Sequence, residues 1–160
     1  MGADATGLDA APENIAAARV HAAGQGLAID YRAGSVETLG EAERYDLVCS
    51  MEVIEHVADP AAFVRGLVRA LAPGGLLVMS TPNRTPLSKL ALITLGEGAG
   101  MIPRGTHDHA KFLTPEELSA LLTDAGLSVV ETRGLSFDPA KGFRLSDDVR
   151  MDYLVAAVRG

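Results

Sequence analysis

The length, composition and charge of the chain set the first limits on its structure and function. Its 160 residues suit one domain, and 48% hydrophobic with 22% charged residues is an ordinary globular composition. The formal net charge of -7 excludes a general affinity for nucleic acid, because phosphate binding needs clustered Lys and Arg. No uninterrupted run of about 18 apolar residues occurs and no basic segment precedes an apolar one near the start. We therefore expect no transmembrane helix, no secretion signal and a cytoplasmic location.

The first third of the chain predicts a strand, a helix and a second strand. Residues 5–9 form a strand candidate that ends in an acid, Asp9. The helix is expected from Pro12 to about residue 23. Pro fits the first helical turn, and Gly24 and Gly26 follow the last turn and end the helix. Residues 27–32 are the second strand candidate, and residues 37–44 read as a loop with a helical turn. The helix residues expected to face the core are Ile15, Ala18 and Val20.

The rest of the chain continues this alternation. Residues 45–51 (YDLVCSM) and 76–81 are predicted to be buried strands, and the only cysteine, Cys49, is interpreted as a core residue rather than a nucleophile. A helix between them begins at Asp59-Pro60, with apolar residues at helical spacing. Thr114 begins another helix, because it is followed by Pro and then by an acid at the third helical position.

Two final strands, over residues 128–134 and 151–158, have only a polar loop between them. This predicts an antiparallel hairpin at one edge of the sheet, since parallel neighbours need a longer crossover. The whole order predicts an α/β fold: a doubly wound, mostly parallel sheet with helices on both faces and a C-terminal antiparallel hairpin. We expect one domain over residues 1–160, with an apolar insertion over residues 85–105.

Four stretches together resemble class I S-adenosylmethionine-dependent methyltransferases, and within them the ubiquinone-biosynthesis O-methyltransferase family. The stretches are TGLDAAPENIAAARVHA at 6–22, YDLVCSMEVIEHVADP at 45–60, LAPGGLLVMSTPNR at 71–84 and GTHDHAKFLTPEELSALLTDAGL at 105–127. The resemblance covers nearly the whole chain and implies a Rossmann-like enzyme that methylates a hydroxyl of a polyprenylated phenol or catechol, a quinone precursor. Two alternatives stay open: a methyltransferase of another small phenolic acceptor, and a non-catalytic scaffold module of the same fold.

The resemblance implies four residues that bind S-adenosylmethionine. Asp9 would accept hydrogen bonds from both ribose hydroxyls, because a carboxylate can take two O–H donors side by side. Met51 would contact the cofactor after its strand. Ser35 and Val36 would lie near the adenine, and Ser35 stands where many relatives carry an acid. An Asp before a helix also suits a plain capping role.

Three residues after the 45–51 strand could hold a metal ion. Glu52, Glu55 and His56 are spaced i, i+3 and i+4, so one helical face would carry all three. Two carboxylates side by side are costly unless a cation or a proton is shared between them. The resemblance implies Mg²⁺ at these positions, although Zn²⁺ or Mn²⁺ would compete for a set that contains imidazole. An exposed polar turn is the structural alternative.

The implied chemistry is methyl transfer to a phenolic oxygen. A phenol is a poor nucleophile while protonated, and a bound cation would lower its pKa. Without a metal, His56 could act as the general base. His107 is a second catalytic candidate and His109 a weaker one, and loop polarity is the alternative explanation for both.

The segment PLSKLALITLGEGAGMI, residues 86–102, is apolar and contains one lysine, Lys89. Three interpretations compete for it: a lid over the active site, a surface for a partner in a quinone-biosynthesis complex, and a shallow contact with the inner membrane. The last suits a polyprenyl-tailed substrate that resides in a bilayer, with Lys89 and Arg104 near anionic headgroups.

The resembled family opens with a strand and a G-x-G-x-G turn before the helix that precedes Asp9. Residues 1–3 do not contain that motif. Since such a turn supplies backbone donors to the cofactor, we expect these 160 residues alone to be catalytically silent although their lineage is an enzyme.

Overall fold

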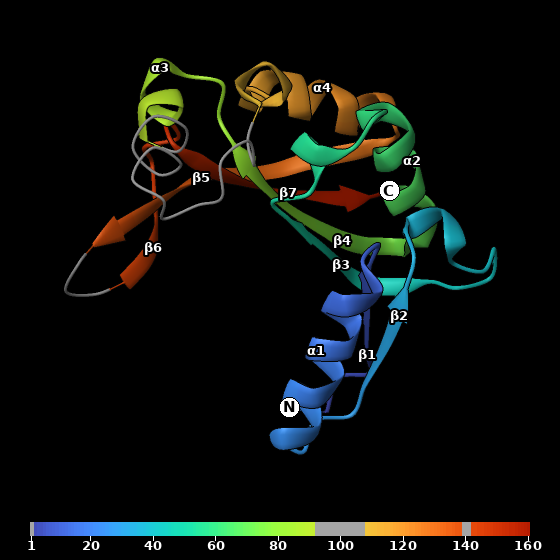
Figure 1. Ribbon diagram of the computed structural model, residues 1–160. Coiled ribbons are helices and arrows are strands. Elements are labelled where there is room, and N and C mark those ends of the chain that lie inside the picture. Colours follow the sequence, from blue (N-terminus) through green and yellow to red (C-terminus); the bar gives the residue numbers. More distant parts are fainter. Residues whose placement is uncertain (1, 92–107, 139–141) are drawn as a thin grey trace. The chain divides into compact units, whose positions relative to one another are not determined.

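Figure 1 shows the computed structural model of the chain, which describes residues 2–91, 108–138 and 142–160. The chain forms two compact units, Met1–Glu43 and Arg44–Gly160. The strands are β1 (Ala5–Asp9), β2 (Ile29–Ala33), β3 (Tyr45–Met51), β4 (Leu71–Pro82), β5 (Leu127–Asp138), β6 (Gly142–Ser146) and β7 (Asp152–Arg159). The helices are α1 (Pro12–Gly24), α2 (Pro60–Ala70), α3 (Pro86–Ser88) and α4 (Pro115–Asp124), with 3-10 turns η1 (Val36–Thr38), η2 (Ile54–His56) and η4 (His109–Lys111).

The first unit is a βαβ motif. Strands β1 and β2 pair in parallel, with Asp9 opposite Ala33 at their carboxyl ends. Helix α1 makes the crossover and buries Ile15 and Ala22. The predicted core position of Val20 is wrong, since its side chain is 74% exposed. Val20 is five residues after Ile15, which places it about 140° around the helix, whereas Ala22 at i+7 returns to the same face.

The second unit contains a mixed five-stranded sheet in the order β3-β4-β7-β5-β6. Strands β3 and β4 are parallel, and β7 is antiparallel to both of its neighbours, β4 and β5. The predicted α/β class with antiparallel C-terminal strands is thus confirmed. The loop predicted between the last two strands contains β6, and the edge hairpin is formed by β5 and β6. Residues 143–146 alternate between apolar and polar side chains, and this period-2 pattern explains the extra strand.

Helices α2 and α4 contact each other and pack over β4, β5 and β7, as Figure 1 shows. Both begin at the predicted caps: Asp59 Oδ1 accepts from the Ala62 N–H at 2.9 Å, and Thr114 forms a reciprocal capping box with Glu117. Within the ranges described, no helix is both long and apolar enough to span a bilayer. The fully buried core side chains of this unit include Val64, Leu77, Met79, Phe112, Leu118, Leu122 and Tyr153.

Strand β3 differs from its prediction as a buried strand. It is an edge strand of the five-stranded sheet, and Leu47 and Met51 are 54% and 43% exposed. Cys49, on the same face, is also exposed, so its assignment to the core is wrong. The apolar run was correct for a strand, but an edge position with one open face cannot be read from hydrophobicity alone.

A close backbone crossing explains one glycine of β5. A Cβ on Gly134 would lie 1.8 Å from the carbonyl oxygen of Asp148 and 2.4 Å from its carbonyl carbon. Asp148 belongs to the connection between β6 and β7. This connection can therefore cross β5 at Gly134 only because that residue has no side chain.

Gly134→Ala is expected to lower the free energy of unfolding by about 1–3 kcal/mol, because the clash is with backbone that must move. Urea denaturation followed by circular dichroism measures the change. The matched control is Gly24→Ala, since a Cβ there meets no atom within 4 Å. Equal stability of the two variants would contradict the close crossing.

Candidate functional site

The carboxyl end of β1 positions the first predicted site residue, Asp9. Its Oδ1 accepts from the Ala11 N–H at 2.8 Å, and its Oδ2 accepts from the Asn14 side chain at 3.0 Å. The carboxylate is thereby fixed at the start of α1. This arrangement includes the capping role considered for Asp9, and each oxygen keeps further acceptor capacity for a ligand.

The segment after β2 brings Ser35 and Val36 beside the end of β1. Gly34 N–H donates to the Asp9 carbonyl at 2.9 Å, so the two strand ends are joined by a backbone hydrogen bond. Ser35 is exposed at the start of η1, and Val36 is buried. Three of the four predicted cofactor residues therefore lie together, because carboxyl ends of parallel neighbours share one sheet edge.

The carboxyl end of β3 carries Met51, the fourth predicted cofactor residue, followed by Glu52. Glu52 has φ 54°, in the left-handed region that non-glycine residues seldom adopt. Ser80, on the adjacent strand β4, holds this conformation. Its Oγ donates to Glu52 Oε1 at 2.6 Å, and the Glu52 N–H donates to the Ser80 carbonyl at 3.1 Å.

Glu55 and His56 form the second part of this site. The Glu55 side chain is buried, with its Oε2 accepting from Thr81 Oγ1 at 2.9 Å. Its Oε1 has no hydrogen-bond partner and lies 3.7 Å from Nε2 of His56. The His56 side chain is 46% exposed, so the pair combines a buried carboxylate with an imidazole that solvent can reach.

Burial and neighbouring acids raise the pKa values of two groups at this site, Glu52 and Tyr153. Although Glu52 as a residue is exposed, burial of its carboxylate raises the pKa of Glu52 from 4.5 to about 7. The charges of Glu55 and Asp152 act in the same direction, while the Ser80 hydrogen bond opposes them. Burial, followed by nearby acids, also raises the pKa of Tyr153 well above its usual value, so this phenol stays neutral and donates to the Leu113 carbonyl.

The predicted single helical face is wrong. The turn η2 begins at Ile54, so Glu52 lies outside it, and its positive φ redirects the chain before the turn. Both carboxylates accept hydrogen bonds from hydroxyls instead. Among the residues that the structure describes, no group of three or more His, Cys, Asp or Glu side chains is placed to hold a metal ion. Glu52, Glu55 and His56 therefore do not fit a three-ligand metal centre in this arrangement.

The other two histidines predicted as catalytic candidates are His107 and His109. His107 lies outside the described residues, as does most of the predicted insertion over residues 85–105. His109 Nε2 lies 3.0 Å from the Thr85 carbonyl, and its ring meets the Phe112 ring edge-on at 5.5 Å between centroids. These contacts give His109 a structural role.

Several residues that shape the site were not predicted from the sequence. They are Asn14, Ser80, Thr81 and Asp152. Ser80 and Thr81 could have been found, since two hydroxyl residues that end a buried strand need partners. Asp152 could not, because it reaches the site through the pairing of β7 with β4.

Comparisons with known proteins point to one family. A family model described as a methyltransferase domain matches residues 1–132. The ubiquinone biosynthesis O-methyltransferase of Methylobacterium nodulans is 46% identical over 162 residues, which is 99% of this chain and 65% of the relative. That of Cereibacter sphaeroides (strain ATCC 17025) is 47% identical over 163 residues, 99% of this chain and 66% of the relative. The chain thus spans somewhat less than two thirds of the length of these relatives.

Solved structures share the fold. Magnesium protoporphyrin IX methyltransferase from Synechocystis PCC 6803, crystallised with bound S-adenosylhomocysteine, aligns with a TM-score of 0.69 and 20% identity. The alignment covers 99% of this chain and 67% of that one. At this identity the likeness concerns the fold, and it supports the predicted class I methyltransferase architecture.

Thr81→Val is expected to lower the free energy of unfolding by about 1–3 kcal/mol, because the buried Glu55 carboxylate loses its hydroxyl donor. Thr123→Val is the matched control. Thr123 Oγ1 donates to the Ser119 carbonyl on an exposed part of α4, so its loss should change stability by less than about 0.5 kcal/mol. Urea denaturation compares the two, and equal effects would contradict the role of Thr81.

Glu52→Gln should remove a pH-dependent loss of stability. Below pH 4.5 the carboxyl is protonated in both the folded and the unfolded chain, whereas between 4.5 and about 7 the unfolded chain ionises first. The wild type therefore loses stability relative to the variant across this window, and the difference is constant above it. Urea midpoints measured with a chelator at pH 4.5 and 7.5 test this, with Glu131→Gln as the exposed control. A difference that does not grow with pH would contradict the raised pKa.

Proposed function

The chain belongs to the methyltransferase domain family, and from this we propose that the native protein is an S-adenosylmethionine-dependent O-methyltransferase of ubiquinone biosynthesis. Its acceptor would be a hydroxyl of a polyprenylated phenol or catechol. Residues 1–160 would form part or all of one such methyltransferase domain. The observation that carries this proposal is the identity of 44–47% to ubiquinone biosynthesis O-methyltransferases over 99% of the chain.

The cofactor would bind at the carboxyl ends of the parallel strands. Asp9, already fixed by the Ala11 N–H, would accept the ribose hydroxyls, and Ser35 and Val36 would lie near the adenine. Met51 is 43% exposed at the end of β3, as a thioether that contacts a ligand must be. The adjacency of Asp9 and the 34–36 segment supports these assignments.

The chain's own residues would manage the acceptor proton. S-adenosylmethionine supplies an electrophilic methyl group and leaves as S-adenosylhomocysteine after the acceptor oxygen attacks. His56 would take the proton from the acceptor hydroxyl as the O–CH₃ bond forms. The buried Glu55 carboxylate, 3.7 Å from His56 Nε2, would stabilise the resulting imidazolium. No step is assigned to Mg²⁺, because both carboxylates accept hydroxyl hydrogen bonds here.

The apolar segment of residues 86–102 would contact the membrane in which such a substrate resides, at the cytoplasmic face of the inner membrane. In its described part, Leu87 and Leu90 are 39% and 51% exposed. Exposed leucines of this kind support a shallow interfacial contact. The same segment could also meet other members of a quinone-biosynthesis complex.

Methyl transfer from labelled S-adenosylmethionine to a polyprenylated catechol, catalysed by the native protein, tests the proposal. Asp9→Ala should raise the KM for S-adenosylmethionine about 10- to 100-fold, because the lost contacts to the ribose are charge-assisted hydrogen bonds of about 1.5–3 kcal/mol.

Asp4→Ala, which removes an exposed acid just before β1, should leave the KM unchanged. Methyl transfer by the wild type with an unchanged KM in Asp9→Ala would reject the role of Asp9. No transfer to any phenolic acceptor would reject the function itself.

A further inference from the structure

The hairpin formed by β5 and β6 has one exposed apolar face, which we call the hairpin face. Its register places Phe137 opposite Phe143 and Leu135 opposite Leu145, so all four side chains share that face. Phe137, Phe143 and Leu145 are 63%, 70% and 57% exposed. The two rings contact each other, with centroids 5.1 Å apart. Such a concentration of exposed apolar side chains marks a surface on which an apolar ligand can bind.

The hairpin face is continuous with the candidate site through the strand register. Asp152 of β7 lies opposite Pro82 of β4 on one side and opposite Leu135 of β5 on the other. Leu135 in turn lies opposite Leu145 of β6, and directly opposed residues point to the same side of a sheet. Asp152 and the hairpin face therefore share one side of the sheet. Leu135 is about 5 Å and Leu145 about 10 Å across the strands from Asp152.

Asp152 also connects this row of side chains to the polar part of the site. The pKa of Glu52 is raised chiefly by burial, and the charge of Asp152 adds to the rise, so the two carboxyls lie close together. Ser80, which holds Glu52, lies opposite Leu154, two residues after Asp152 on β7, and therefore points to the same side of the sheet. This side thus carries acidic groups where β3 ends and β7 begins and, next to them, apolar side chains on β5 and β6.

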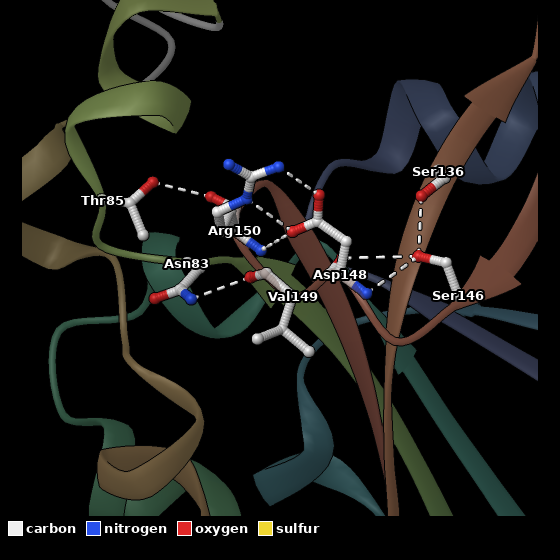
Figure 2. Close-up of polar contacts among 7 residues, drawn as sticks. All are labelled: Asn83, Thr85, Ser136, Ser146, Asp148, Val149 and Arg150. Atoms are coloured by element: carbon white, nitrogen blue, oxygen red, sulfur yellow. Dashed lines mark hydrogen bonds and ion pairs between the residues drawn. The ribbon is translucent and has the colours of Figure 1, made fainter.

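Polar contacts fix the hairpin relative to the end of β4, as Figure 2 shows. The hydroxyls of Ser136 and Ser146 share a hydrogen bond of 2.7 Å, and Ser146 Oγ accepts from the Asp148 N–H. Further along the connection to β7, the Val149 carbonyl accepts from the Asn83 side chain at 2.8 Å. A ligand that spans the site and the hairpin face would therefore meet a surface that is already ordered, which lowers the entropic cost of binding.

The size and composition of the hairpin face favour a single hydrocarbon chain over a second protein. A stable protein interface takes about 20–30 residues from each side, whereas this face offers four apolar side chains on two strands. Arg144, a charged residue of β6, lies on the other face, 3.7 Å from Asp138. The hairpin face begins one strand away from Asp152, so a ligand that fits both parts has a polar head and an attached hydrocarbon tail.

We propose that the hairpin face binds the polyprenyl tail of the methyl acceptor while its phenolic ring lies beside Asp152. The tail would leave the ring over Leu135 and lie against Phe137 and Phe143. Its burial there would strengthen binding in proportion to the apolar area that leaves water. This inference rests on the proposed function and deepens it, because it makes the hairpin the determinant of specificity for prenylated over plain phenols.

The acceptor preference of the native protein tests the proposal, in solution without vesicles or detergent. A catechol with a geranyl tail is compared with the same catechol without a tail, and the ratio of their kcat/KM values measures the contribution of the tail. The double variant Phe137→Ser with Phe143→Ser should lower this ratio about tenfold, as the loss of about 60 Å² of apolar contact would. The matched control is Val130→Ser, which should keep the ratio, since Val130 is a 57% exposed apolar residue of β5 outside the hairpin.

Saturation-transfer NMR with geraniol measures the same contact without methyl transfer, because geraniol has the tail but no phenolic ring. The wild type should transfer saturation to the geraniol methyl groups, and the double serine variant should transfer much less. Phe137→Leu with Phe143→Leu should retain most of the transfer, since leucine is also apolar.

An unchanged kcat/KM ratio in the double serine variant would overturn the tail site and leave the proposed function standing. So would a dimer in sedimentation equilibrium that this variant dissociates while the ratio stays the same. A wild type that binds geraniol through the hairpin but methylates no phenolic acceptor would instead reject the proposed function alone. Leu145→Ser replaces the double variant if circular dichroism shows that the latter is unfolded.

Discussion

The hydroxyl groups of Ser80 and Thr81 hold the two carboxylates that follow β3, and the local structure of the second unit depends on them. Parallel pairing places Met51 opposite Ser80, so the chain leaving β3 passes directly over these hydroxyls. A buried carboxylate without hydrogen bonds would cost several kcal/mol. With them, Glu52 keeps its left-handed backbone and Glu55 stays buried beside His56. A candidate catalytic pair is therefore built on an ordinary strand pairing.

Local signals in the sequence predicted the parts of the fold that depend on a few adjacent residues. The capping sequences at Asp59 and Thr114 located two helix starts, because a cap and its partner N–H are only three residues apart. Asp9 was predicted at the end of a strand, and the structure brings it beside the 34–36 segment because the carboxyl ends of parallel neighbours share one sheet edge. Cofactor binding by these residues remains a prediction.

Features that depend on long-range pairing were not predictable in the same way. The exposure of Cys49 follows from the edge position of β3, which no pattern within YDLVCSM encodes. Asp152 approaches Glu52 only because β7 pairs with β4, some 70 residues earlier in the chain. The spacing of Glu52, Glu55 and His56 suggested a helix, but the Ser80 hydrogen bonds stabilise a different backbone. In each case a tertiary contact outweighs the local preference.

The place of β7 in the sheet has a consequence for synthesis on the ribosome. Strands β4 and β5 are separated by β7, which follows both of them in the chain. During translation, the edges of β4 and β5 that pair with β7 keep unpaired backbone groups until residues 152–159 have left the exit tunnel. The nascent chain therefore exposes two unpaired strand edges, one on β4 and one on β5, in the interval between the emergence of β5 and the emergence of β7.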